Sequence, residues 1–104
     1  MKYMNDYDLS CARRQYGQGR TPNRLALVMV VDSLREWTDN HSDGWAYWPK
    51  PCRAAAKAME LIDTREDTDI TDGEMQAAVR PIKAFMTRES VDPRNRELIL
   101  RSVV

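Results

Sequence analysis

Few residues of this sequence could do covalent chemistry, and the most reactive pair is Cys52 with the only histidine, His41. A cysteine nucleophile needs a nearby histidine to accept its proton and a third group to orient that histidine. Nothing around His41, which lies between Asp39 and Asp43, matches such a motif, so we interpret it as a surface loop residue. The sequence also lacks a paired-cysteine metal site, a phosphate-binding glycine loop and a nucleophilic serine elbow. We therefore expect a protein that is not an enzyme, with no catalytic residue, no metal and no cofactor.

A group of carboxylates raises the question of calcium. Asp67-Thr68-Asp69 and Asp72-Gly73 resemble part of an EF-hand loop. With Asp67 as the first position, however, Asp72 stands where the motif requires glycine, and Ala78 stands where it requires a bidentate acid. The register therefore excludes an EF-hand. We expect a flexible, solvated acidic connector or a docking strip for a basic partner.

Large aromatic side chains gather in one short segment that contains Trp45, Tyr47 and Trp48. They would either fold back over a small hydrophobic core or anchor a partner, because aromatic residues contribute strongly to both kinds of contact. The sequence favours the core for some of them and leaves open which ones are exposed.

A basic stripe follows directly. On a helix, Lys50, Arg53 and Lys57 lie at i, i+3 and i+7 and so share one side. Such a stripe is either a solvated helix face, a nucleic-acid contact or a match for an acidic protein surface. Together with Trp45, Tyr47 and Trp48, these three cations are the candidate partner-binding residues.

Composition limits the partners. The 104 residues are 42% hydrophobic and 31% charged, and their formal net charge is zero. This neutrality disfavours a general polyanion binder, whose affinity rests on phosphate neutralisation. The charges are nevertheless segregated into blocks, which suits one oriented protein partner. Cys11 and Cys52 belong to no paired motif, and the longest apolar run, Leu25 to Val31, is far shorter than a membrane span. We expect a cytoplasmic protein without membrane contact.

Helical signals position these residues. Asp8 is expected to cap a helix that runs to about Tyr16, and Thr21-Pro22 to begin a central buried helix that ends at Asp39. Its first turns are apolar nearly all round, so a buried strand over residues 25–31 is the alternative. After a loop over residues 40–50, a third helix is expected from Pro51 to Thr64.

Two further helices are predicted. Thr71 and Glu74 form a capping box for a helix that keeps one apolar stripe past Pro81, where a kink is expected. Asp92-Pro93 is expected to begin a last helix, whose tail over 98–104 could also be a strand. The sequence thus predicts a single all-α domain over 1–104. It would be a bundle of four or five helices with the aromatic loop packed over the central helix. Whether residues 1–8 are ordered stays open.

Segments such as Gly19-Arg20-Thr21-Pro22 and Trp48-Pro49-Lys50-Pro51 resemble small accessory proteins of actinobacterial phages. This resemblance implies a modulator that binds a larger host or phage protein. The residues themselves favour a non-catalytic protein-binding module, and a homodimer fits the surplus of aromatic and alanine residues. The alternative is a DNA-binding regulator with a degenerate helix-turn-helix, although the expected gap between its helices exceeds the usual three or four residues.

Overall fold

The computed structural model describes residues 3–15, 21–41, 49–89 and 94. These residues form four helices, α1 (Asp6–Gln15), α2 (Asn23–His41), α3 (Pro49–Thr64) and α4 (Asp72–Arg88). The described part of the chain contains no strand, so the all-α prediction is confirmed and the strand alternative for residues 25–31 is wrong. The expected aromatic loop and nearly all of the expected last helix lie outside the described residues.

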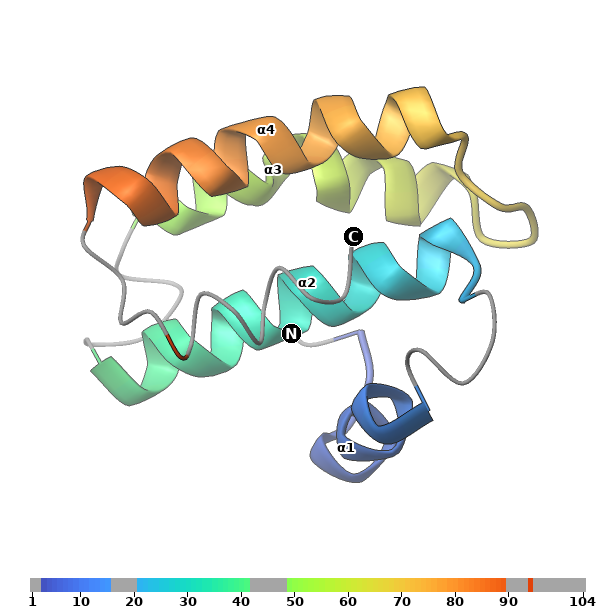
Figure 1. Ribbon diagram of the computed structural model, residues 1–104, viewed down its shortest axis with the longest axis horizontal. Coiled ribbons are helices and arrows are strands. Elements are labelled where there is room, and N and C mark those ends of the chain that lie inside the picture. The colour runs from blue at the N-terminus through green and yellow to red at the C-terminus, as the bar shows by residue number, and fades with distance from the viewer. Residues whose placement is uncertain (1–2, 16–20, 42–48, 90–93, 95–104) are drawn as a thin grey trace.

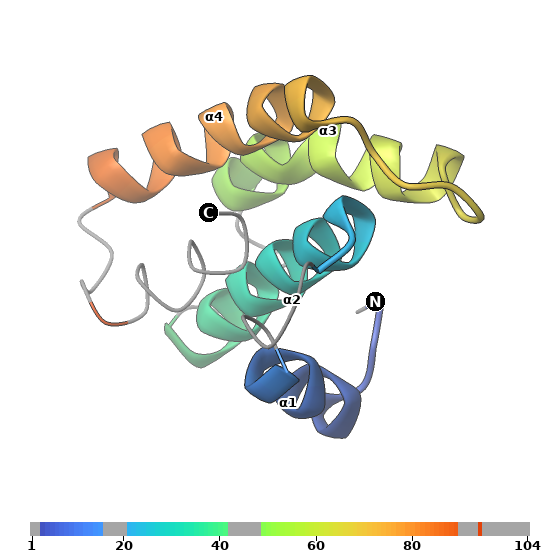
Figure 2. The same ribbon diagram turned by 45° about the vertical axis from the view of Figure 1, so that its right-hand side comes forward.

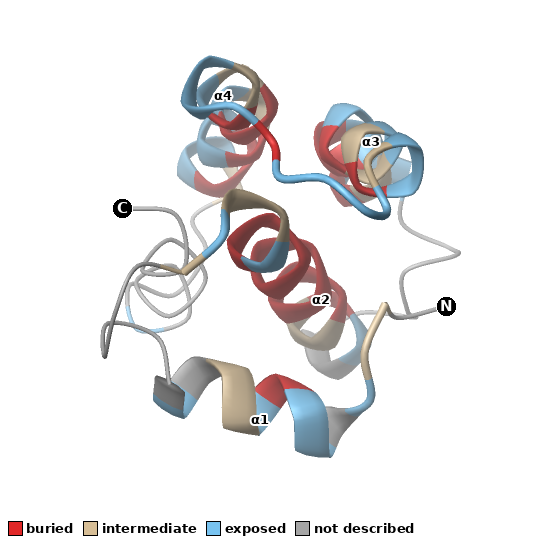
Figure 3. Ribbon diagram, turned by 90° about the vertical axis from the view of Figure 1, so that its right-hand side faces the viewer, coloured by how far each residue is buried: buried red, intermediate tan, exposed pale blue. Residues whose placement is uncertain are grey.

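The helices are arranged around α2. Figure 1 shows α3 and α4 running side by side in opposite directions, with α2 along one face of the pair. The turned view in Figure 2 shows α1 on the other side of α2. Colouring by burial places the buried residues of α3 and α4 on the sides of these helices that face α2 (Figure 3). The hairpin formed by α3 and α4 therefore has an inner face toward the core and an outer face toward solvent.

Helix α2 is the central element, as the sequence predicts. Every residue from Ala26 to Arg35 is buried, because the helix is covered by α3 and α4 on one side and by α1 on another. Its predicted stripe is confirmed at Leu27, Val30, Val31 and Leu34, which have no exposed surface, while Trp37 is half-buried against the same cluster.

Helix α4 also follows its sequence signals. The side chain of Thr71 accepts the backbone N–H of Glu74, and the Glu74 side chain accepts the backbone N–H of Thr71, which completes the capping box. The helix continues through Pro81 as one element, in agreement with the unbroken apolar stripe. That stripe is buried at all its predicted positions, Met75, Ala78, Val79, Ile82 and Met86, together with Phe85.

Several predicted boundaries differ from those of the structure. Helix α3 begins at Pro49 rather than Pro51, and α2 continues to His41, so residues 42–48 separate the two helices. Both prolines fit the first turn of α3, where a backbone N–H has no intrahelical acceptor. Helix α1 begins at Asp6, and Asn5 instead of Asp8 supplies the cap, because the Asn5 Oδ1 atom accepts the backbone N–H of Asp8 at 2.7 Å.

The residues before α1 are attached to the bundle by a buried carboxylate. Asp32, on α2, has no exposed surface and accepts the backbone N–H groups of Tyr3 at 3.0 Å and Met4 at 2.9 Å. The guanidinium carbon of Arg35 lies 5.4 Å from the centre of the Tyr3 ring. Burial raises the pKa of Tyr3 to about 12, and the negative charge of the nearby Asp63 carboxylate on α3 adds to this effect. Residues 3 and 4 thus connect α2 to α3, and this polar cluster is explained by the fold.

Candidate functional site

The predicted basic stripe lies on the outer face of α3. Lys50, Arg53 and Lys57 are all exposed, whereas Ala54, Ala55 and Ala58 of the same helix are buried. This division follows from helical geometry, since the alanines allow α3 to pack closely on its neighbours while the long cations point away. The structure therefore brings together the three candidate cations. The other three candidates, Trp45, Tyr47 and Trp48, lie outside the described residues.

Lys50 has a structural contact that the sequence did not indicate. Its Nζ atom lies 3.2 Å from Oε1 of Glu89, the residue that caps the C-terminus of α4. The pair joins the first turn of α3 to the last turn of α4, although the Lys50 side chain is still 57% exposed. Exposed ion pairs of this kind contribute little to stability, typically below about 1 kcal/mol. Arg53 and Lys57 form no ion pair within the described part of the chain, so they are the cations most available to a partner.

Helix α4 adds cations that sequence reasoning missed. Because α3 and α4 are antiparallel (Figure 1), the second half of α4 lies beside the first half of α3. Arg80, Lys83 and Arg88 are exposed there. We call this region the basic end of the hairpin, made up of Lys50, Arg53, Lys57, Arg80, Lys83 and Arg88. Its signal in the sequence was the short connector between the two helices, which predicts antiparallel neighbours.

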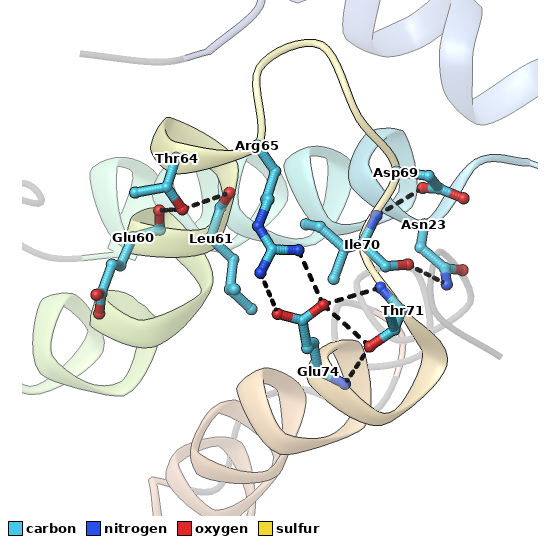
Figure 4. A network of polar contacts seen from close by, with 9 residues as sticks. All are labelled: Asn23, Glu60, Leu61, Thr64, Arg65, Asp69, Ile70, Thr71 and Glu74. Atoms are coloured by element: carbon cyan, nitrogen blue, oxygen red, sulfur yellow. Dashed lines mark hydrogen bonds and ion pairs between the residues drawn. The ribbon is translucent and has the colours of Figure 1, made fainter.

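The opposite end of the hairpin carries the carboxylates. We call it the acidic end, made up of Glu60, Asp63, Glu66, Asp67, Asp69, Asp72 and Glu74. A bidentate ion pair crosses it, with Arg65 Nη1 and Nη2 lying 3.0 and 2.7 Å from the two oxygens of Glu74 (Figure 4). The hydrogen bonds from Arg65, and then those from Thr71, hold the pKa of Glu74 below its ordinary value.

The acidic connector is also bonded to the start of α2. Asp69 accepts the backbone N–H of Arg24 at 2.9 Å, so it caps α2 from a distant part of the chain. The Asn23 side-chain amide donates to the carbonyl of Ile70 and to the carboxylate of Asp72, both at 2.7 Å. Ile70 itself is buried in the core. The connector is exposed from Glu66 to Asp69, as expected of a solvated segment, but the buried Ile70 and the cap that Asp69 supplies to α2 attach it to the fold.

A third contact supports the same junction. The guanidinium of Arg24 donates to the carbonyl of Ile62 through Nε at 3.2 Å and through Nη2 at 3.0 Å. This carbonyl belongs to the last turn of α3, where carbonyls lack intrahelical donors and a cation is favourable. Arg24 therefore serves the fold and does not add to the exposed basic surface.

The remaining chemical candidates gain no support from the geometry. Cys11 and Cys52 are free thiols, and both are half-buried. His41 is the last residue of α2, and the structure does not describe its side chain. Among the described residues, no group of three or more histidine, cysteine or acidic side chains could hold a metal ion. No helix in the described ranges is both long and apolar enough to span a bilayer.

The chain was compared with models of protein families, with curated proteins and with solved structures, and none of them matches it.

Proposed function

We propose that the protein is a non-catalytic, cytoplasmic protein-binding module, an adaptor or inhibitor of a larger partner. Its binding surface is the basic stripe of α3 together with the aromatic segment that precedes it. The observation that carries this proposal is the exposure of Arg53 and Lys57, which point to solvent and form no ion pair within the described ranges. Side chains that the fold does not use are free to meet an acidic surface on a partner.

The distribution of charge supports a protein partner over a nucleic acid. A phosphate backbone attracts a broadly basic surface, but here the basic end is balanced by an acidic end on the same hairpin. A local basic patch on a chain of zero net charge suits an acidic patch on one oriented protein partner. The sequence places Trp45 and Trp48 directly before α3, next to the cations. There they would supply the apolar anchor that charged contacts alone rarely provide.

The DNA-binding alternative uses the same helix. Arg53 and Lys57 would contact the phosphate backbone or base edges, with α3 as the recognition helix. Residues 42–48 between α2 and α3 are fewer than the sequence suggested but still more than the usual turn of three or four. Nucleic-acid binding would weaken steeply with added salt.

The test is an affinity capture from lysate, with and without nuclease. The wild type is compared with Arg53→Glu/Lys57→Glu and with Trp45→Ala/Trp48→Ala. The matched control is Glu66→Lys/Asp67→Lys, which reverses two exposed charges at the other end of the hairpin. We expect a protein that resists nuclease treatment, is lost with the basic-stripe variant and is retained with the control.

Circular dichroism of each variant separates binding from folding. If the tryptophan variant is folded but captures no partner, the aromatic segment belongs to the binding surface. If the same variant is unfolded, its tryptophans belong to the core. Recovery of nucleic acid, or of proteins that disappear after nuclease treatment, would contradict the proposal and favour the DNA-binding alternative.

A further inference from the structure

The α3–α4 hairpin has ends of opposite charge. The basic end collects the exposed cations of both helices, and the acidic end collects exposed carboxylates such as Glu66 and Asp67. Both ends belong to one antiparallel pair of helices, which places them at a fixed separation (Figure 1). A surface of this kind is complementary to a copy of itself turned end for end. Since the net charge of the chain is zero, two copies have no overall repulsion to overcome.

The outer side of α4 allows close approach between these ends. Gly73, Ala77 and Pro81 follow one another at intervals of four residues, so they form one row along the helix. All three are exposed or half-buried. A Cβ atom placed on Gly73 would meet no atom within 4 Å, so this position faces open space. The row itself carries no bulky side chain, and the exposed Arg80, three residues after Ala77, borders it and brings charge to the contact.

We propose that two copies of the chain associate through α4 in antiparallel orientation, with Arg80 and Arg88 of each copy against the acidic connector of the other. A two-fold axis that crosses α4 satisfies this pairing. Arg88 ends α4 and the connector with Glu66 precedes its start, so an antiparallel pair brings the end of α4 in one copy toward the connector of the other. The same operation repeats the contact at the second end, as an isologous interface requires. The two α4 macrodipoles then also run antiparallel, which is favourable.

This pairing does not depend on the proposed function. The dimer uses Arg80 and Arg88 of α4 with the acidic connector, whereas the partner surface uses Arg53 and Lys57 of α3. If the chain is monomeric but captures its partner, the dimer proposal is wrong and the proposed function is unaffected. A chain that dimerises yet captures no protein would contradict the proposed function alone.

The test is sedimentation equilibrium of the full chain at low and high salt. We expect a dimer at low salt that dissociates near 1 M salt, where screening acts within about 3 Å. Arg80→Glu/Arg88→Glu and Glu66→Lys/Asp67→Lys should each weaken self-association by about a hundredfold or more, because they place like charges together. An equal mixture of the two variants should form a heterodimer, in which both contacts are again between opposite charges.

The chain that carries all four substitutions is the decisive control. Its net charge is again zero and the four substituted positions have exchanged signs, so the contacts between them are again between opposite charges and the chain should form a homodimer like the wild type. A wild type that is monomeric at low salt would overturn the proposal. A measured mass that rises above that of two chains as the concentration increases would also overturn it, because a two-fold pair leaves no copy of the interface free for a third chain. Continued monomeric behaviour of the four-substitution chain, while the wild type dimerises, would show that charge pairing is not the cause.

Discussion

The acidic and basic ends of the hairpin carry similar numbers of charges but use them differently. At the acidic end, Asp69 caps α2, Asp72 accepts a hydrogen bond from Asn23, and Glu74 binds Arg65. At the basic end, Arg53 and Lys57 are exposed and contribute no ion pair to the described part of the fold. The difference separates charges that hold the structure together from charges available for recognition. It predicts that substitutions at the two ends affect different properties.

The largest expected effect lies at the acidic end, where Ile70 fixes the connector to the core. Its side chain is 1% exposed. Ile70→Ala should lower the free energy of unfolding by about 2–5 kcal/mol, through lost burial and the cavity left behind. Urea denaturation measures this directly. A loss below about 1 kcal/mol would mean that the connector contributes little to the fold, and the comparison between the two ends would fail.

A smaller loss is expected for Asn23→Ala, which removes the two hydrogen bonds that the Asn23 side chain donates to Ile70 and Asp72. The carbonyl of Ile70 then loses its donor, and we expect a cost of about 1 kcal/mol. Gln76→Ala is the matched control, because this amide is exposed on α4. Equal unfolding midpoints for the two variants would show that Asn23 does not stabilise the junction.

The contribution of Glu74 should depend on pH. Its folded-state pKa lies below the ordinary value of 4.5 because Arg65 and Thr71 stabilise the carboxylate. The stabilisation is therefore fully present above the unfolded-state pKa and is lost as the pH falls through the folded-state pKa. The unfolding free energies of the wild type and Glu74→Gln should differ at pH 7, and the difference should shrink as the pH falls below 4.5 and through the folded-state pKa. A pH-independent difference would contradict this assignment.

The smallest effect on stability is expected at the basic end. Arg53→Ala and Lys57→Ala remove exposed side chains and should each change the free energy of unfolding by less than about 0.5 kcal/mol. Thermal unfolding checks this expectation. A large loss of unfolding free energy in either variant would show that this cation stabilises the fold. It would then belong with the structural charges of the acidic end and not with the charges available to a partner.

The sequence predicted those parts of the fold that depend on local signals. The capping box of Thr71 and Glu74 and the apolar stripes of α2 and α4 needed only residues within a few turns of each other. Contacts between distant parts of the chain were not predictable in this way. Nothing near Asp69 shows that it caps α2, and nothing near Asp32 shows that its carboxylate binds the backbone of Tyr3 and Met4.

The candidate site shows the same division. The helical spacing of Lys50, Arg53 and Lys57 predicted a shared face, which the structure confirms. The ion pair between Lys50 and Glu89 and the addition of the α4 cations depend on how two helices pack, so spacing along one helix does not reveal them.

The measurement that tests the central claim most directly is made on Arg53→Glu/Lys57→Glu alone, with stability and partner capture determined on the same preparation. The account predicts an unfolding temperature close to that of the wild type, together with loss of the nuclease-resistant partner. A folded variant that still captures this partner would contradict the claim that the basic stripe is the binding surface.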